Sequence, residues 1–120
     1  MEFDKDLSAR QEARLLARQA EVAQEVLGKM TQAQLDAIVR AVAESFEAHA
    51  EELARQAVEE TGFGNVGDKT VKNRFASRHV FEAVRDMKTV GVLNENPAEK
   101  LWEVGVPVGV IAAIVPSTNP

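Results

Sequence analysis

The sequence predicts an α/β fold in which N-terminal helices lead into a β-hairpin at the start of a larger sheet domain. Apolar residues recur at helical intervals from about residue 8 to residue 87. From residue 101 onward the chain is rich in β-forming residues, and residues 110–115 are continuously apolar, as is typical of a strand buried on both faces of a sheet. We therefore expect a helical segment over residues 1–97, and over residues 98–120 a hairpin followed by the first loop of an incomplete sheet domain.

The composition excludes several classes of function. The 120 residues carry a net charge of −5, and 13 of the 19 acidic side chains fall in the first 60 residues. This half lacks the basic footprint that binding to nucleic acid or to an anionic membrane requires. The first six residues include four charged ones and no apolar core follows them, unlike a signal peptide. We expect a cytoplasmic protein without nucleic-acid or membrane partners.

Two residue types that often carry chemistry contribute little here. The chain has no cysteine, which excludes disulfides, thiolate metal sites and a cysteine nucleophile within these residues. His49 and His79 fall inside predicted helices without neighbouring ligands, so we expect no metal site.

Two helices are predicted before the first glycine-rich stretch. Ser8 and Gln11 stand at the spacing of a capping box, and Gly28 is a suitable helix end. Thr31 and Gln34 form a second capping box, from which the helical pattern continues to residue 61 with a bend near His49.

Gly62, Gly64 and Gly67 stand at the spacing of a dinucleotide-binding turn, and Asp86 follows where a ribose-binding acid would be expected. Such a turn requires a strand leading into its first glycine. Here a long helical pattern leads in. We therefore interpret the stretch as a turn between helices, with Asp68 as the cap of the next helix.

A third helix is predicted over residues 68–87. One side of it is apolar, and it also carries five basic residues, Lys69, Lys72, Arg74, Arg78 and Arg85. A solvated or subunit-facing surface is the simpler interpretation of these charges, and contact with a phosphorylated ligand is the alternative.

The hairpin is predicted after a loop at residues 94–97. Residues 101–106 suit a first strand, residues 106–109 suit a type I turn, and residues 110–115 suit the second strand. The polar residues after that strand lie where open α/β sheets bind ligands, at the carboxyl end of a strand.

Five stretches of the sequence carry a resemblance to a known family. The stretches "PVGVIAAIVPSTNP", "DKTVKNRFAS", "KTVGVL", "ETGFGNVGDK" and "TQAQLDAIVRA" together resemble, in order, the N-terminal part of CoA-acylating aldehyde dehydrogenases, including the first half of bifunctional aldehyde–alcohol dehydrogenases. The resemblance implies a fold in which the hairpin leads into a Rossmann-like NAD-binding domain. It also implies that the complete enzyme interconverts a small aldehyde and its acyl-CoA through a cysteine thiohemiacetal, with NAD as hydride acceptor and coenzyme A as co-substrate.

The resemblance also assigns candidate residues. It places the loop of Ile114, Val115, Pro116, Ser117, Thr118 and Asn119 at the NAD site, near the nicotinamide ribose. Non-acylating members of the superfamily use an asparagine of this loop as an oxyanion-hole donor, which makes Asn119 a candidate for that role. Their asparagine stands two residues after the first proline, where this chain has Thr118. The resemblance further implies a homo-oligomer, because the early strands of these enzymes join a sheet between subunits.

Without a cysteine, we expect the 120 residues alone to be inactive and assign the activity to a longer parent protein. Two alternatives to this interpretation remain open. The chain could instead be a small helical interaction module without catalysis, although the apolar strand at 110–115 argues against this. The first helix could also be a targeting peptide, whereas the resemblance favours the first helix of the enzyme domain.

Overall fold

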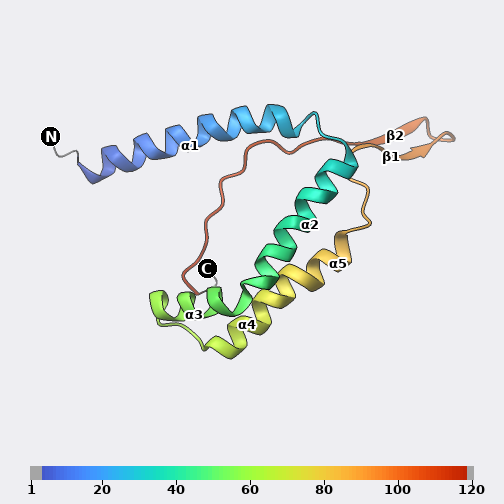
Figure 1. Cartoon of the computed structure of the whole chain (residues 1–120). Helices are drawn as coiled ribbons and strands as arrows, with labels where there is room; N and C mark the ends of the chain where they lie inside the picture. Colours follow the sequence, from blue (N-terminus) through green and yellow to red (C-terminus); the bar gives the residue numbers. More distant parts are fainter. Residues whose placement is uncertain (1–3, 119–120) are drawn as a thin grey trace. The chain divides into compact units, whose positions relative to one another are not determined.

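The computed structural model describes residues 4–118, which form helices and a two-stranded antiparallel sheet (Figure 1). The chain divides into two compact units. The first combines Met1–Thr31 with Thr89–Ala112, and the second combines Gln32–Lys88 with Ala113–Pro120. Within the described residues, no helix has both the length and the apolar character needed to cross a membrane.

The first unit begins with helix α1 (Lys5–Leu27). This helix starts three residues before the predicted position, since Ser8 already donates its N–H to the carbonyl of Asp4 at 3.1 Å. Gly28 ends the helix as predicted, but in the right-handed conformation, with φ −63°. No residue of α1 is buried.

The hairpin consists of strands β1 (Gly91–Asn96) and β2 (Leu101–Gly105), which pair antiparallel. The prediction of a strand from residue 101 is confirmed, but the predicted partner is wrong. β2 pairs with the segment before it, so three residues of the predicted loop at 94–97 belong to β1.

Local side-chain chemistry explains why the chain reverses between β1 and β2. The N–H of Lys100 donates to the carbonyl of Pro97 at 3.4 Å, which closes a turn over residues 97–100. The Asn96 Oδ1 accepts from the N–H of Glu99 at 3.3 Å, and its Nδ2 donates to the Glu99 carboxylate at 2.9 Å. Lys100 then takes a left-handed φ of 53°. A bulge at Leu93 shifts the pairing register within β1.

Residues 110–115, the predicted second strand, pair with no other strand in the described part of the chain. They are extended and exposed, and the side chain of Ile114 is 96% exposed. A strand is defined by hydrogen bonds to its neighbours, and an apolar strand of this type requires neighbours on both edges. The preceding hairpin does not provide them, because β1 and β2 pair with each other.

The second unit begins with helices α2 (Gln32–Ala48) and α3 (Ala50–Thr61). The predicted bend at His49 is confirmed, since this residue separates the two helices with φ −102°. The His49 Nδ1 lies 2.7 Å from the carbonyl oxygen of Ser45, where it caps the end of α2.

The glycine-rich stretch is a turn between helices, as predicted. α3 ends at Gly62, whose φ of 71° is left-handed, and helix α4 (Val66–Arg74) begins four residues later. The predicted cap was wrong. Asn65, not Asp68, is the N-cap, because its Oδ1 accepts from the Asp68 N–H at 2.9 Å. Asp68 is instead the third helical residue, and its carboxylate accepts from the Asn65 side chain at 2.6 Å.

The predicted third helix contains a π-helical turn. α4 continues into the turn η1 (Phe75–His79) and then into α5 (Val80–Val84). At its end the N–H of Val80 donates to the carbonyl of Phe75, five residues back. Together α4, η1 and α5 form one composite helix, and α2 lies alongside it (Figure 1).

Small side chains let α3 approach α4 closely. Ala50 and Ala54 of α3 are almost completely buried, at 1% and 0% exposed. Asn73 on α4 donates its side-chain N–H to the carbonyl of Ala50 at 3.0 Å, across the two helices. Ser77, in the π-helical turn, donates its hydroxyl to the carbonyl of Asn73 at 2.8 Å. These contacts fix α4 against the start of α3.

Candidate cofactor-binding loop

The predicted cofactor-binding residues occupy the C-terminal part of the second unit. The structure describes Ile114, Val115, Pro116, Ser117 and Thr118, all of which are exposed. Asn119 lies outside the described residues, and its oxyanion role stays a prediction. The hydroxyl groups of Ser117 and Thr118 make no hydrogen bond within residues 4–118.

One hydrogen bond connects this loop to the helices. Lys69, on the first turns of α4, donates from its Nζ to the main-chain carbonyl of Thr118 at 3.0 Å. The lysine is only 7% exposed. Residues 113–118 make no other hydrogen bond within the described part of the chain. In the sequence, Lys69 is only one of five basic residues on a predicted helix, so nothing there indicates its contact with the loop.

The glycine turn contributes to this arrangement by leaving space for the lysine. Gly64 has a left-handed φ of 74°. A Cβ atom at this position would lie 3.2 Å from the Cε of Lys69. The glycine spacing that mimics a dinucleotide fingerprint therefore serves helix packing here, and the loop that the resemblance assigns to NAD lies next to the same lysine.

The basic residues of the composite helix do not form one uniform surface. Arg78 lies 3.5 Å from the Glu47 carboxylate on α2 and 3.2 Å from that of Glu82 on its own helix. Arg85 pairs with Asp86 at 3.3 Å. The hydrogen bond with Glu82, followed by the charge of Glu47, raises the pKa of Arg78, and the same hydrogen bond lowers the pKa of Glu82. These two arginines thus neutralise carboxylates of the chain itself.

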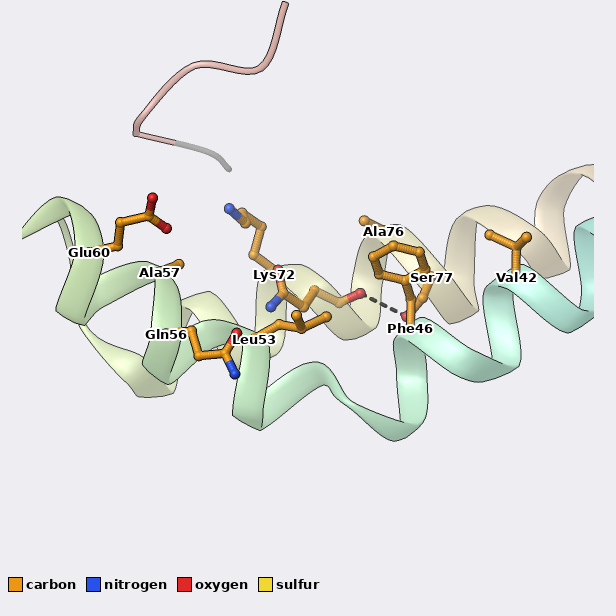
Figure 2. A pocket seen from close by; sticks show the side chains of 10 residues that line it. Val42, Phe46, Leu53, Gln56, Ala57, Glu60, Lys72, Ala76 and Ser77 are labelled. Carbon is orange, nitrogen blue, oxygen red and sulfur yellow. Dashed lines mark hydrogen bonds between the residues drawn. The ribbon is translucent and has the colours of Figure 1, made fainter. Parts of the chain in front are cut away.

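A second feature of this unit is an open groove of about 670 Å³ between α2, α3 and the composite helix (Figure 2). Most of its surface is apolar, although five of the ten lining residues are polar or charged, with Glu60 and Lys72 as the charged members. The complete lining is Val42, Phe46, Leu53, Gln56, Ala57, Glu60, Lys72, Asn73, Ala76 and Ser77. Within residues 4–118, no three acidic, histidine or cysteine residues gather as a metal site would require.

Comparison with known proteins gives a consistent result over nearly the whole chain. The profile of the aldehyde dehydrogenase family matches residues 5–120. The bifunctional aldehyde-alcohol dehydrogenase AdhE of Escherichia coli (strain K12) is 40% identical over 109 residues. The acetylating succinate-semialdehyde dehydrogenase of Clostridium kluyveri is 40% identical over 105 residues. These matches cover 91% and 88% of this chain.

Comparison of the three-dimensional structure with solved structures gives the same family. The crystal structure of an acetylating aldehyde dehydrogenase from Geobacillus thermoglucosidasius matches 98% of the chain with a TM-score of 0.94 and 48% sequence identity. The helices and the two-stranded sheet therefore belong to a fold that is also found in that enzyme. The chain spans a small part of each relative: 12% of the Escherichia coli protein, 23% of the Clostridium protein and 26% of the Geobacillus chain.

Proposed function

Because the chain belongs to the aldehyde dehydrogenase family, we propose that it is the N-terminal segment of an NAD-dependent, CoA-acylating aldehyde dehydrogenase. The complete protein would interconvert a small aldehyde and its acyl-CoA. The observation that carries this proposal is the likeness to the Geobacillus acetylating enzyme, at 48% identity over 98% of this chain. The name of the Clostridium relative, an acetylating dehydrogenase, supports the same reaction class, and that of the Escherichia coli relative supports an aldehyde dehydrogenase.

The described loop is chemically suited to a dinucleotide. Ser117 and Thr118 offer hydroxyl groups that no residue in the described part of the chain occupies. Ile114 and Val115 present exposed apolar side chains beside them. A nicotinamide ribose needs hydrogen-bonding partners for its hydroxyls and apolar contact for its ring. In this proposal the loop from Ile114 to Asn119 binds and orients NAD, which supplies the hydride acceptor for the oxidation.

The remaining chemistry must come from other parts of the protein. Acyl transfer to coenzyme A requires a nucleophile that forms a thioester, and a thiolate is the group suited to this step. The 120 residues contain no cysteine. We therefore expect them to be inactive alone and to act by holding one side of the cofactor. Asn119 remains the candidate oxyanion-hole donor.

Further properties belong to the same proposal. We expect a cytoplasmic homo-oligomer whose partners are the small aldehyde and coenzyme A, without nucleic-acid or membrane partners. The acidic net charge of −5 supports the exclusion of nucleic acid. Light scattering on the complete protein would give its oligomeric state directly.

A helical interaction module is the second candidate, and one observation favours it. The apolar residues of α1 are exposed, including Leu16, Val22 and Val26 at 58%, 66% and 57%. Exposed stripes of this kind are typical of helices that dock on a partner. In the enzyme proposal the same stripe is covered by other parts of the complete protein.

The mass of the native gene product distinguishes the two candidates. An antibody raised against this segment would detect it in the source cells. A species several times heavier than 13.1 kDa supports the enzyme, and the purified protein should then reduce NAD only when both a small aldehyde and CoA are present. A species at 13.1 kDa would contradict the enzyme proposal and favour the interaction module.

A further inference from the structure

Lys69 is a buried lysine without a carboxylate partner. Lysine is seldom buried unless its charge is paired. Lys69 is 7% exposed, yet within residues 4–118 no carboxylate lies within ion-pair distance of its Nζ. Its acceptor is the carbonyl of Thr118, at 3.0 Å. The cost of burying the ammonium is thus offset by a main-chain group of the candidate cofactor-binding loop.

The lysine is held in this direction by its surroundings. Its stem passes over Gly64, where an added Cβ would be 3.2 Å from Cε and 3.9 Å from Nζ. Lys69 is also in the first turns of α4, whose start is held by the cap between Asn65 and Asp68. The ammonium therefore extends from a rigid position toward the loop.

The bond from Lys69 is the only hydrogen bond that residues 113–118 make among residues 4–118. Residues 113–118 form no strand or helix, and every side chain in this stretch is exposed. A charged donor fixes the direction of the carbonyl that it binds, and the planar peptide group passes this orientation to the neighbouring atoms.

We propose that Lys69 is a positioning residue for the NAD-binding loop, acting on the cofactor through the Thr118 carbonyl. This inference rests on the proposed function, since it assumes that residues 114–119 bind NAD. Lys69 itself has no role in the chemical step. Its loss should weaken cofactor binding and leave the binding of CoA and the fold unchanged.

The test compares three variants of the complete protein. Lys69→Met removes the charged donor while keeping the length of the side chain. Lys69→Arg keeps a charged donor. Lys29→Met makes the same chemical change at an exposed lysine just after α1 and serves as the matched control. For each protein, the Kd values of NADH and of CoA are measured by fluorescence titration, and Tm is measured by calorimetry.

We expect the Kd of NADH to rise about tenfold in Lys69→Met, which corresponds to a loss of about 1.4 kcal/mol. The KM of NAD should rise equally, while the Kd of CoA and the kcat at saturating NAD stay near wild type. Lys69→Arg should recover most of the NADH affinity, and Lys29→Met should resemble wild type.

Several results would overturn the inference. An unchanged NADH affinity in a folded Lys69→Met protein would do so, as would an equal weakening of NADH and CoA binding, which indicates a general structural role. If Lys69→Met does not fold, Lys69→Gln is judged by the same two affinities, and failure of both to fold also counts against the inference. A wild-type protein that neither binds NADH nor reduces NAD would instead refute the proposed function, and the inference with it.

Discussion

At the scale of single residues, a few polar and glycine positions decide how the chain turns. Asn65 caps α4 through its side-chain oxygen, and Gly62 and Gly64 take left-handed φ angles in the turn before it. Gly105 has a different role, because it allows a close approach between two main-chain segments of the first unit. Because each role depends on one side chain or its absence, a single substitution in the complete protein can test it.

Replacement of Gly105 by alanine should destabilise the protein. A Cβ at this position would collide with the main-chain carbonyl of Thr89 and would lie 3.2 Å from the side chain of Leu93. Forced overpacking of this kind costs about 1–3 kcal/mol, and a lower Tm in calorimetry would show it. Gly67→Ala is the matched control, since its nearest neighbour, the Asn65 Oδ1, would be 3.4 Å away and alanine favours the helix. Equal Tm values for both variants would contradict the expected collision.

Removal of the cap at Asn65 should destabilise the start of α4. Asn65→Ala loses the acceptor for the Asp68 N–H and should lower the unfolding free energy by about 1 kcal/mol. Asn65→Ser keeps a capping oxygen and should cost less. Chemical denaturation of the two variants beside wild type measures the difference. If alanine and serine were equivalent, the capping role would be wrong.

At the scale of elements, the helices are more predictable than the strands. The pattern of apolar residues indicates the break at His49 and the turn at Gly62, and both are confirmed. Helix hydrogen bonds and caps join residues three to four positions apart, so they can be read from short stretches of sequence. The predicted strand from residue 101 is confirmed, but its predicted partner, residues 110–115, is wrong, because β2 pairs with the preceding segment. Both flanking segments are suitable in composition, and the turn formed by residues 96–100 decides between them.

The contact between α3 and α4 provides a test at this scale. Asn73→Asp removes the N–H that reaches the Ala50 carbonyl and places a negative charge beside that oxygen. Loss of this part-buried hydrogen bond, with a charge placed beside the acceptor, costs about 1–3 kcal/mol. Asn94→Asp makes the same change at an exposed position of β1 and should alter the unfolding free energy by less than about 0.5 kcal/mol. A Tm of Asn73→Asp no lower than that of Asn94→Asp would show that the contact contributes nothing.

At the scale of the whole molecule, the chain has little core of its own. Ala50 and Ala54 are the only buried apolar residues among residues 4–118. Large apolar side chains on α1, on α2 and in residues 110–115 are exposed, and the groove of the second unit is open. Such surface is unusual for a soluble domain that acts alone. It agrees with a segment that covers 26% of a related enzyme chain.

The isolated 120-residue chain should therefore behave differently from the complete protein. We expect it to bind the dye ANS strongly, to self-associate, and to show no NADH binding at micromolar concentrations. It should also fail to reduce NAD with any aldehyde and CoA, because it has no thiol nucleophile. Fluorescence titration and light scattering check these outcomes. Micromolar NADH binding by the isolated chain would argue that it is an independent cofactor-binding module.

The sequence by itself determined the helices, the glycine turn between them, the family resemblance and the exclusion of a cysteine nucleophile from these residues. These features depend on residue identity or on contacts within a few positions of the chain. The partner of β2 depends on the local turn after β1, which the composition of the flanking segments does not reveal. Only the tertiary structure decided that Lys69 binds the Thr118 carbonyl across 49 positions. Contacts between distant residues form only where packing brings their groups together, so they have no periodic signal in the sequence. For the same reason a basic residue on a predicted helix became a candidate for positioning the cofactor only once its neighbours in space were known.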